Sequence, residues 1–169
     1  MAYIHHSPDG DLYNVNFAVG LPAPNKRDDV LLVQWLLHRV YTDHPLLSPP
    51  DADIAIDGWI GPQTVKWVRA FQADVRRLGR PCARDGRVDS ARKPVGLVSK
   101  TPYTILYLNG ALLTANPDVY ADPGSDPDKP TELLSALLVN DGSAGPFAAV
   151  PAGGDVPAGP VQVPASGGI

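Results

Sequence analysis

The chain has 169 residues, a mass of 17.9 kDa, a formal net charge of −4 and 44% hydrophobic residues. Its hydrophobic content is sufficient for one buried core, but 19 prolines and 16 glycines are too many for a chain folded along its whole length. The single cysteine, Cys82, excludes an internal disulfide, and no apolar run approaches the length of a membrane span.

Residues 1–27 are predicted to form an extended arm and a connector. Residues 1–11 carry neither a basic start nor an apolar run, so we expect no signal peptide. We therefore expect the protein to be made in the cytoplasm and then either exported by a non-classical route or incorporated into an extracellular or phage assembly. Apolar side chains alternate from Tyr13 to Val19, which predicts a half-buried strand. A lone strand cannot satisfy its own backbone groups, so it must pair with the domain or with another chain.

The first predicted helix begins at a cap formed by Asp28 or Asp29, runs to about Tyr41 and is apolar on two faces. Its expected core stripe consists of Val30, Val33, Leu37 and Val40. The opposite face carries Leu31, Leu32 and Trp35. A helix of this kind is normally covered on both faces. Either the arm or the C-terminal tail covers the second face, or that face is an interface with Trp35 as its anchor.

The central segment is a turn followed by a long helix. Asp57-Gly58 is a turn signal, because glycine accepts a positive φ and aspartate accepts hydrogen bonds from the turn backbone. Gly61-Pro62 marks a helix start, with proline at the first helical position. We therefore expect structural roles for Asp57, Gly58 and Gly61. The apolar stripe of this helix is Thr64, Val68, Phe71, Val75 and Leu78, and Gly79 and Pro81 end it.

These residues carry a resemblance to a known family. The pattern is Asp57-Gly58-x-x-Gly61-x-x-Thr64 followed by Val68, Phe71 and Gln72, with Val33-Gln34-x-x-Leu37 upstream. It resembles the repeat of the small helical peptidoglycan-binding domains of bacterial and phage proteins, over roughly residues 20–114. Asp85-Gly86 is similar to a second copy of the turn, but the Gly and Thr that should follow it are missing. Trp67 stands where the family usually has a small residue.

The resemblance implies an all-α, three-helix domain over residues 28–115 that binds peptidoglycan or another anionic wall polymer without catalysis. Its implied binding surface is a shallow groove beside the central turn. There Trp59 would stack on the ligand, and Gln63 and Arg69 would supply polar contacts.

Charge is distributed unevenly along the chain. Nine basic and three acidic residues lie between Lys66 and Lys93, against five basic and fifteen acidic residues elsewhere. This basic run is either a solvated helix face or a surface that meets anionic polymers or an acidic neighbouring subunit. A nucleic-acid partner is not expected, because no aromatic residues alternate with the basic ones and the whole chain is acidic. No membrane partner is expected either.

The remaining segments are a third helix, a loop with a short helix, and a tail. Thr101-Pro102 predicts the start of the third helix, with Ile105, Leu106, Leu108, Leu112 and Leu113 as its apolar set. Residues 116–140 are predicted to be an acidic loop and a helix from Glu132 to Val139 capped by Thr131. Residues 141–169 are rich in Pro, Gly and Ala, a composition typical of a flexible linker.

No catalytic or metal site is expected. None of His5, His6, His38 and His44 has metal-ligand spacing with a carboxylate partner, and Cys82 has no obvious base. We therefore predict neither catalytic residues nor a cofactor.

Two functions remain open at this point. The first is the wall-binding module that the resemblance implies. The second is a structural subunit of a self-assembling particle or filament that reuses the fold, with its arm and tail joining copies. The alternating strand, the Trp35 face and the tail each favour a neighbour, so we expect a homo-oligomer.

Overall fold

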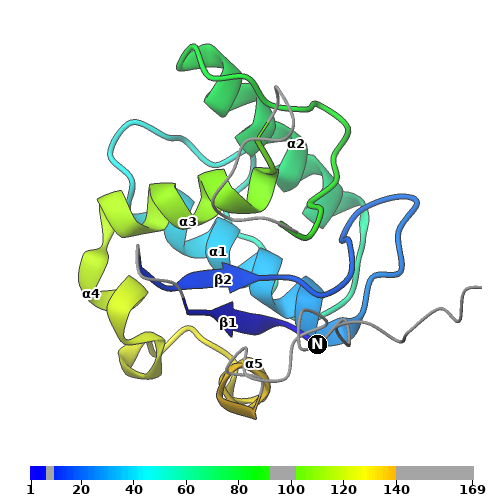
Figure 1. Cartoon of the computed structure of the whole chain (residues 1–169). Coiled ribbons are helices and arrows are strands. Elements are labelled where there is room, and N and C mark those ends of the chain that lie inside the picture. The colour runs from blue at the N-terminus through cyan, green and yellow to red at the C-terminus, as the bar shows by residue number, and fades with distance from the viewer. Residues whose placement is uncertain (7–9, 92–101, 140–169) are drawn as a thin grey trace, which may run out of the picture.

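Helices dominate the structure (Figure 1). It is a computed structural model that describes residues 1–6, 10–91 and 102–139. In these residues the helices are α1 (Arg27–Asp43), α2 (Pro62–Arg77), α3 (Thr104–Ala115), α4 (Pro117–Ala121), the 3-10 turn η1 (Pro123–Ser125) and α5 (Thr131–Val139). Two short strands, β1 (Tyr3–His5) and β2 (Leu12–Asn14), form an antiparallel hairpin. The mostly helical class predicted from the sequence is confirmed, with a small sheet that the all-α prediction omitted.

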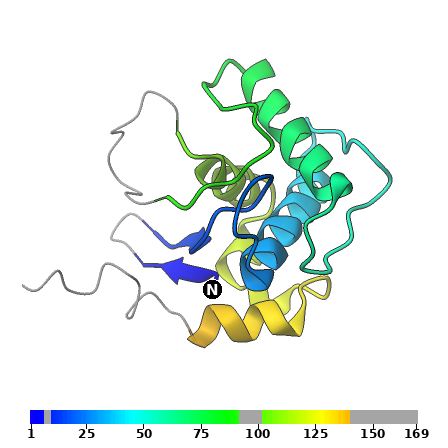
Figure 2. The same ribbon diagram turned by 90° about the vertical axis from the view of Figure 1, so that its right-hand side faces the viewer.

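Helix α1 runs through the centre of the molecule because it is apolar on nearly every side. All residues from Asp29 to Leu37 are buried. The helix contacts α2, α3, α5 and β2, and Figure 2 shows α2 above it and α5 below it. The two-faced apolar pattern of this helix thus corresponds to a central position in the core.

The second apolar face of α1 is covered by the chain itself. Leu31, Leu32 and Trp35 are at most 1% exposed. The ring of Tyr13 meets Trp35 edge-on at a centroid distance of 5.7 Å, and the Trp35 indole N–H donates to the Asp126 carboxylate at 2.6 Å. The arm therefore covers this face together with the segment around Asp126, and the prediction that these three residues form an interface is corrected.

The strand in the N-terminal arm is shorter than predicted, and the arm is part of the core. Its regular strand, β2, ends at Asn14, and Val19 further on pairs with Val88 in an isolated antiparallel bridge. The Asn109 side chain binds both backbone groups of Tyr13, accepting from its N–H and donating to its carbonyl, each at 2.9 Å. The arm's backbone therefore finds its partners within one chain.

The start of α1 differs from the expected cap. The N-cap residue is Lys26, and its side chain makes no capping hydrogen bond. Asp29 is buried instead and accepts hydrogen bonds from the backbone N–H groups of Asn16 and Phe17 at 2.9 and 3.0 Å. This carboxylate fastens the arm to α1 rather than capping the helix.

The later segments also begin at positions other than those predicted. Thr101 lies outside the described residues, and α3 begins at Thr104 after Tyr103, which makes no side-chain cap. Thr131 is the first residue of α5 rather than its cap. The predicted acidic loop contains the short helices α4 and η1. The tail from residue 141 lies outside the described residues, so the assembly prediction that rests on it stays a prediction.

Candidate ligand-binding cleft

The Asp57-Gly58 turn is held by one buried amide from α1. The Gln34 side-chain oxygen accepts from the backbone N–H groups of Asp57 and Gly58 at 3.1 and 2.8 Å. Its nitrogen lies 3.0 Å from an Asp57 carboxylate oxygen and 3.1 Å from the Thr64 hydroxyl. Gln34, Asp57, Gly58 and Thr64 are called here the first turn cage. The cage fixes the start of α2 against α1.

A second turn cage repeats this arrangement with Gln72, Asp85, Gly86 and Thr104. The Gln72 oxygen accepts from the Gly86 backbone N–H at 2.9 Å. Its nitrogen lies 2.9 Å from the Asp85 carboxylate and 3.1 Å from the Thr104 hydroxyl. The local Gly and Thr are missing after Asp85-Gly86, as the sequence shows, but Thr104 takes the place of that threonine from the start of α3, much further along the chain.

Two glycines in these cages are required by the backbone, and Gly61 is not. Gly58 and Gly86 have φ values of +74° and +73°, and an added Cβ would lie 2.8 Å from Arg27 or Arg69, respectively. Gly61 is the N-cap of α2 with a φ of −134°, and an added Cβ there would meet no atom within 4 Å. The backbone therefore requires glycine at position 58, as expected. At position 61 the backbone would accept other residues, so the geometry does not explain why glycine stands there.

The Asp57 carboxylate is stabilised in its charged form by the cage. Burial acts to raise the pKa of Asp57, but hydrogen bonds from the Trp59 backbone and the Gln34 amide, together with the charge of Arg27, outweigh it. The pKa of Asp57 consequently lies below its ordinary value.

The three predicted ligand contacts have three different surroundings. Trp59 is 71% exposed, and the Arg27 guanidinium lies 5.7 Å from its ring centre. The Gln63 amide donates to the Asp53 carbonyl at 2.8 Å. Arg69 lies against Gly86 in the second turn cage. None of the three lines the cleft described next.

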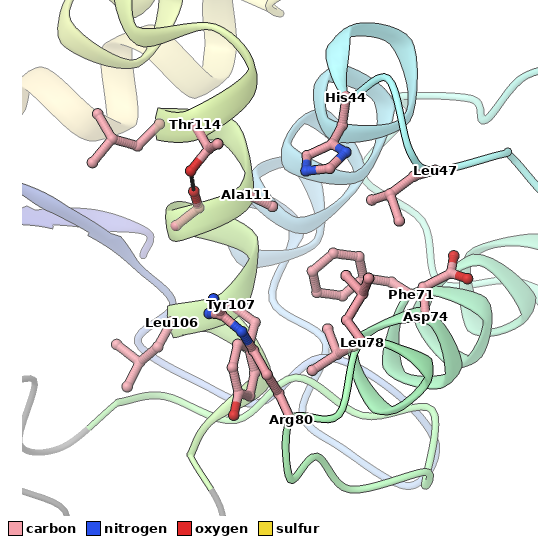
Figure 3. A pocket seen from close by; sticks show the side chains of 13 residues that line it. His44, Leu47, Phe71, Asp74, Leu78, Arg80, Leu106, Tyr107, Ala111 and Thr114 are labelled. Atoms are coloured by element: carbon pink, nitrogen blue, oxygen red, sulfur yellow. Dashed lines mark hydrogen bonds between the residues drawn. The ribbon is translucent and has the colours of Figure 1, made fainter.

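A cleft of about 530 Å³ opens between the C-terminal ends of α1 and α2 and one side of α3 (Figure 3). Its apolar lining is Leu47, Phe71, Val75, Leu78, Leu106, Ala111 and Leu113. Its polar lining is His44, Asp74, Arg80, Tyr107 and Thr114, and Gly110 completes the wall. This size falls within the range of about 300–1,000 Å³ typical of small-ligand sites.

The end of α2 brings Arg80 into the cleft. The Gly79 N–H donates to the Arg76 carbonyl at 2.9 Å, and the Arg80 N–H donates to the Val75 carbonyl at 3.1 Å. With Gly79 at a φ of +79°, these two bonds form a Schellman motif, which turns the chain back across the helix end. Arg80 thereby leaves the solvent face of α2 on which the sequence pattern puts it.

Asp74 is already neutralised within the protein. One carboxylate oxygen accepts from the Tyr41 hydroxyl at 2.9 Å, and the other lies 3.1 Å from the Arg77 guanidinium. Burial and the Asp74 charge together raise the pKa of Tyr41, so this hydroxyl stays protonated as a donor. In contrast, the Arg80 guanidinium makes no hydrogen bond or ion pair with any residue that the structure describes.

The other polar groups of the cleft are partly engaged. The Tyr107 hydroxyl donates to the Pro81 carbonyl at 2.8 Å, and the Thr114 hydroxyl donates to the Gly110 carbonyl at 2.8 Å. Burial raises the pKa of Tyr107. The His44 Nδ1 accepts from the Leu46 backbone N–H at 3.3 Å, which leaves Nε2 as the ring's N–H donor.

In the described ranges, no group of three or more His, Cys, Asp or Glu side chains is arranged to hold a metal ion. No helix in the same ranges is long and apolar enough to cross a membrane. Comparisons with protein-family models, with curated proteins and with solved structures found no match for this chain.

Sequence reasoning missed the cleft residues for an identifiable reason. Arg80 belongs to the basic run between Lys66 and Lys93, which the sequence does not connect with a cleft, and Tyr107 and Thr114 lie on α3, outside the motif. The only local signal is Leu78-Gly79-Arg80-Pro81, a helix stop that redirects the chain. Which surface the redirected arginine meets depends on how the three helices pack.

Proposed function

We propose that this chain is a non-catalytic peptidoglycan-binding module built on a three-helix domain of α1, α2 and α3. The observation that carries the proposal is the duplicated turn cage. Five of the motif residues on which the family resemblance rests belong to one of two similarly bonded cages: Gln34, Asp57, Gly58, Thr64 and Gln72. This agreement between motif and structure supports a shared fold.

The fold likeness alone does not give a function, so a place to bind is also needed. The cleft at the ends of α1 and α2 meets that need, because it combines apolar walls with a cation that has no described partner. The exposed Trp59 beside Arg27 is a second candidate contact.

Sedimentation with purified bacterial sacculi tests the proposal. We expect the wild type to co-sediment and Gly110→Leu to lose most of its binding. Gly110 lines the cleft on α3, and an added Cβ would meet no atom within 4 Å, so a larger side chain fills the cleft without a clash at its base. Replacing a helical glycine also favours the helix, by about 0.5–1 kcal/mol, which separates lost binding from lost folding.

Two further variants complete this experiment. Gly110→Ala is the matched control, because it gives the same helix benefit with little change in cleft volume and should bind as the wild type does. Trp59→Ala reports whether the turn surface contributes. A wild type that stays in the supernatant at every sacculus concentration contradicts the proposed function.

A further inference from the structure

We propose that the cleft binds the free carboxylate of a short peptide whose neighbouring side chains are small and apolar. The inference rests on the proposed function, since the peptide stems of peptidoglycan offer this chemistry, and it selects the stem rather than the glycan as the ligand. It depends on three properties of the cleft: its uncompensated charge, its unused hydrogen-bond donors and its apolar walls.

The charge of the cleft is positive once internal pairs are removed. The Asp74 carboxylate is paired with the Arg77 guanidinium at 3.1 Å and also bonded by Tyr41. Arg80 has no such partner among the residues of the described ranges. An anionic ligand would therefore meet an unopposed guanidinium, whose planar fork suits a carboxylate.

The cleft also keeps hydrogen-bond donors that no described residue uses. The Tyr107 and Thr114 hydroxyl hydrogens are used on the Pro81 and Gly110 carbonyls, and both Asp74 oxygens are occupied. The Arg80 N–H groups and the His44 Nε2–H remain as donors without a described acceptor. A ligand rich in acceptors, as a carboxylate is, matches this set.

The walls favour a peptide over a sugar. Leu78 and Leu113 are each 49% exposed at the cleft, so apolar surface is open to the ligand, while the aromatic ring of Phe71 is only 1% exposed. The ring suited to stacking on a sugar face is that of Trp59, and it does not line the cleft. Methyl-sized side chains flanking a carboxylate fit this surface better than a hydroxylated ring, which would place polar groups against the apolar walls, where they lose water.

The test measures binding of two peptides that differ at one group. Isothermal titration of the full chain would use acetyl-Lys-D-Ala-D-Ala as the free acid, the same peptide as its C-terminal amide, and chitotetraose as the glycan probe. We expect saturable binding of the acid, at least tenfold weaker binding of the amide, and no binding of chitotetraose.

Variants at two arginines locate the effect. Arg80→Gln should remove the preference for the acid. Arg84→Gln removes an exposed arginine outside the cleft and should keep the full preference. Because Arg80 is exposed and lacks a described partner, Arg80→Gln should melt at the wild-type temperature.

Each outcome separates this inference from the proposed function. Equal binding of acid and amide, binding of chitotetraose alone, binding of no probe, or an unchanged acid preference in Arg80→Gln overturns the inference even if the wild type sediments with sacculi. Selective binding of the acid that depends on Arg80, without sedimentation on sacculi, leaves carboxylate recognition in place and removes the wall-binding function.

Discussion

At the scale of a single residue, Gly58 is constrained by both its backbone and its neighbour. Its φ of +74° is unfavourable for any side chain, and the Arg27 side chain lies 2.8 Å from where a Cβ would stand. We expect Gly58→Val to lower the free energy of unfolding by about 1–3 kcal/mol. Thermal melting followed by circular dichroism measures this.

Gly61 provides the matched control for that experiment. Gly61→Ser should leave the melting temperature unchanged or raise it slightly, because serine is a better helix N-cap by a few tenths of a kcal/mol. An equal loss in both variants would show that the turn tolerates no change at either position, contrary to the geometry described above.

Asp57 makes the stability of the protein sensitive to acid. Its folded-state pKa is below its unfolded value, so its contribution is fully present above the unfolded pKa of about 3.9 and is lost as the pH falls through the folded pKa. Urea unfolding between pH 7 and pH 2.5 should therefore show a steeper decline for the wild type than for Asp57→Asn below about pH 4. Parallel curves would rule out Asp57 as a source of acid sensitivity.

At the scale of elements, each turn cage joins two helices through one amide. Gln34→Leu keeps the size of the side chain but leaves the Gly58 N–H and the Thr64 hydroxyl without their buried partner. Since each such group costs about 1–3 kcal/mol, we expect a loss of about 3 kcal/mol or more in urea unfolding. Gln72→Leu should cost a similar amount.

Gln63→Leu is the control for both cage variants. Gln63 is exposed and makes one hydrogen bond, to the Asp53 carbonyl, so its loss should cost at most about 0.5–1.5 kcal/mol. A Gln72 variant as stable as the wild type would show that the second cage does not contribute to the free energy of unfolding.

The sequence best predicts those elements that have a clear start signal and a clear stop signal. Helix α2 lies between Gly61-Pro62 and Gly79, and its observed bounds follow these signals closely. Strand β1 was missed because three residues are too few to show a period. Thr104 and Arg80 were missed because their roles depend on long-range packing: no local pattern states which threonine closes a cage or which surface a chain meets after a turn.

At the scale of the whole molecule, the N-terminal arm completes the core. The Tyr13 ring lies against Trp35 and Tyr120, and its hydroxyl donates to the Tyr120 carbonyl at 2.6 Å. We expect Tyr13→Ala to destabilise the protein by about 3–5 kcal/mol, as for other large aromatic side chains in cores. Thermal melting followed by circular dichroism would report the change in stability.

Phe17 is the control on the same arm. It is 42% exposed, so Phe17→Ala should change the melting temperature far less than Tyr13→Ala. Equal effects would mean that the arm stabilises the fold through its backbone alone.

The repeated cages have a consequence for protein engineering. The same four-residue arrangement is closed across a short connection, from Asp57 to Thr64, and across a much longer one, from Asp85 to Thr104. The geometry of a cage therefore does not depend on the length of chain that it closes. A designed protein could consequently join two helices with the same four residue types without matching the length of either natural connection.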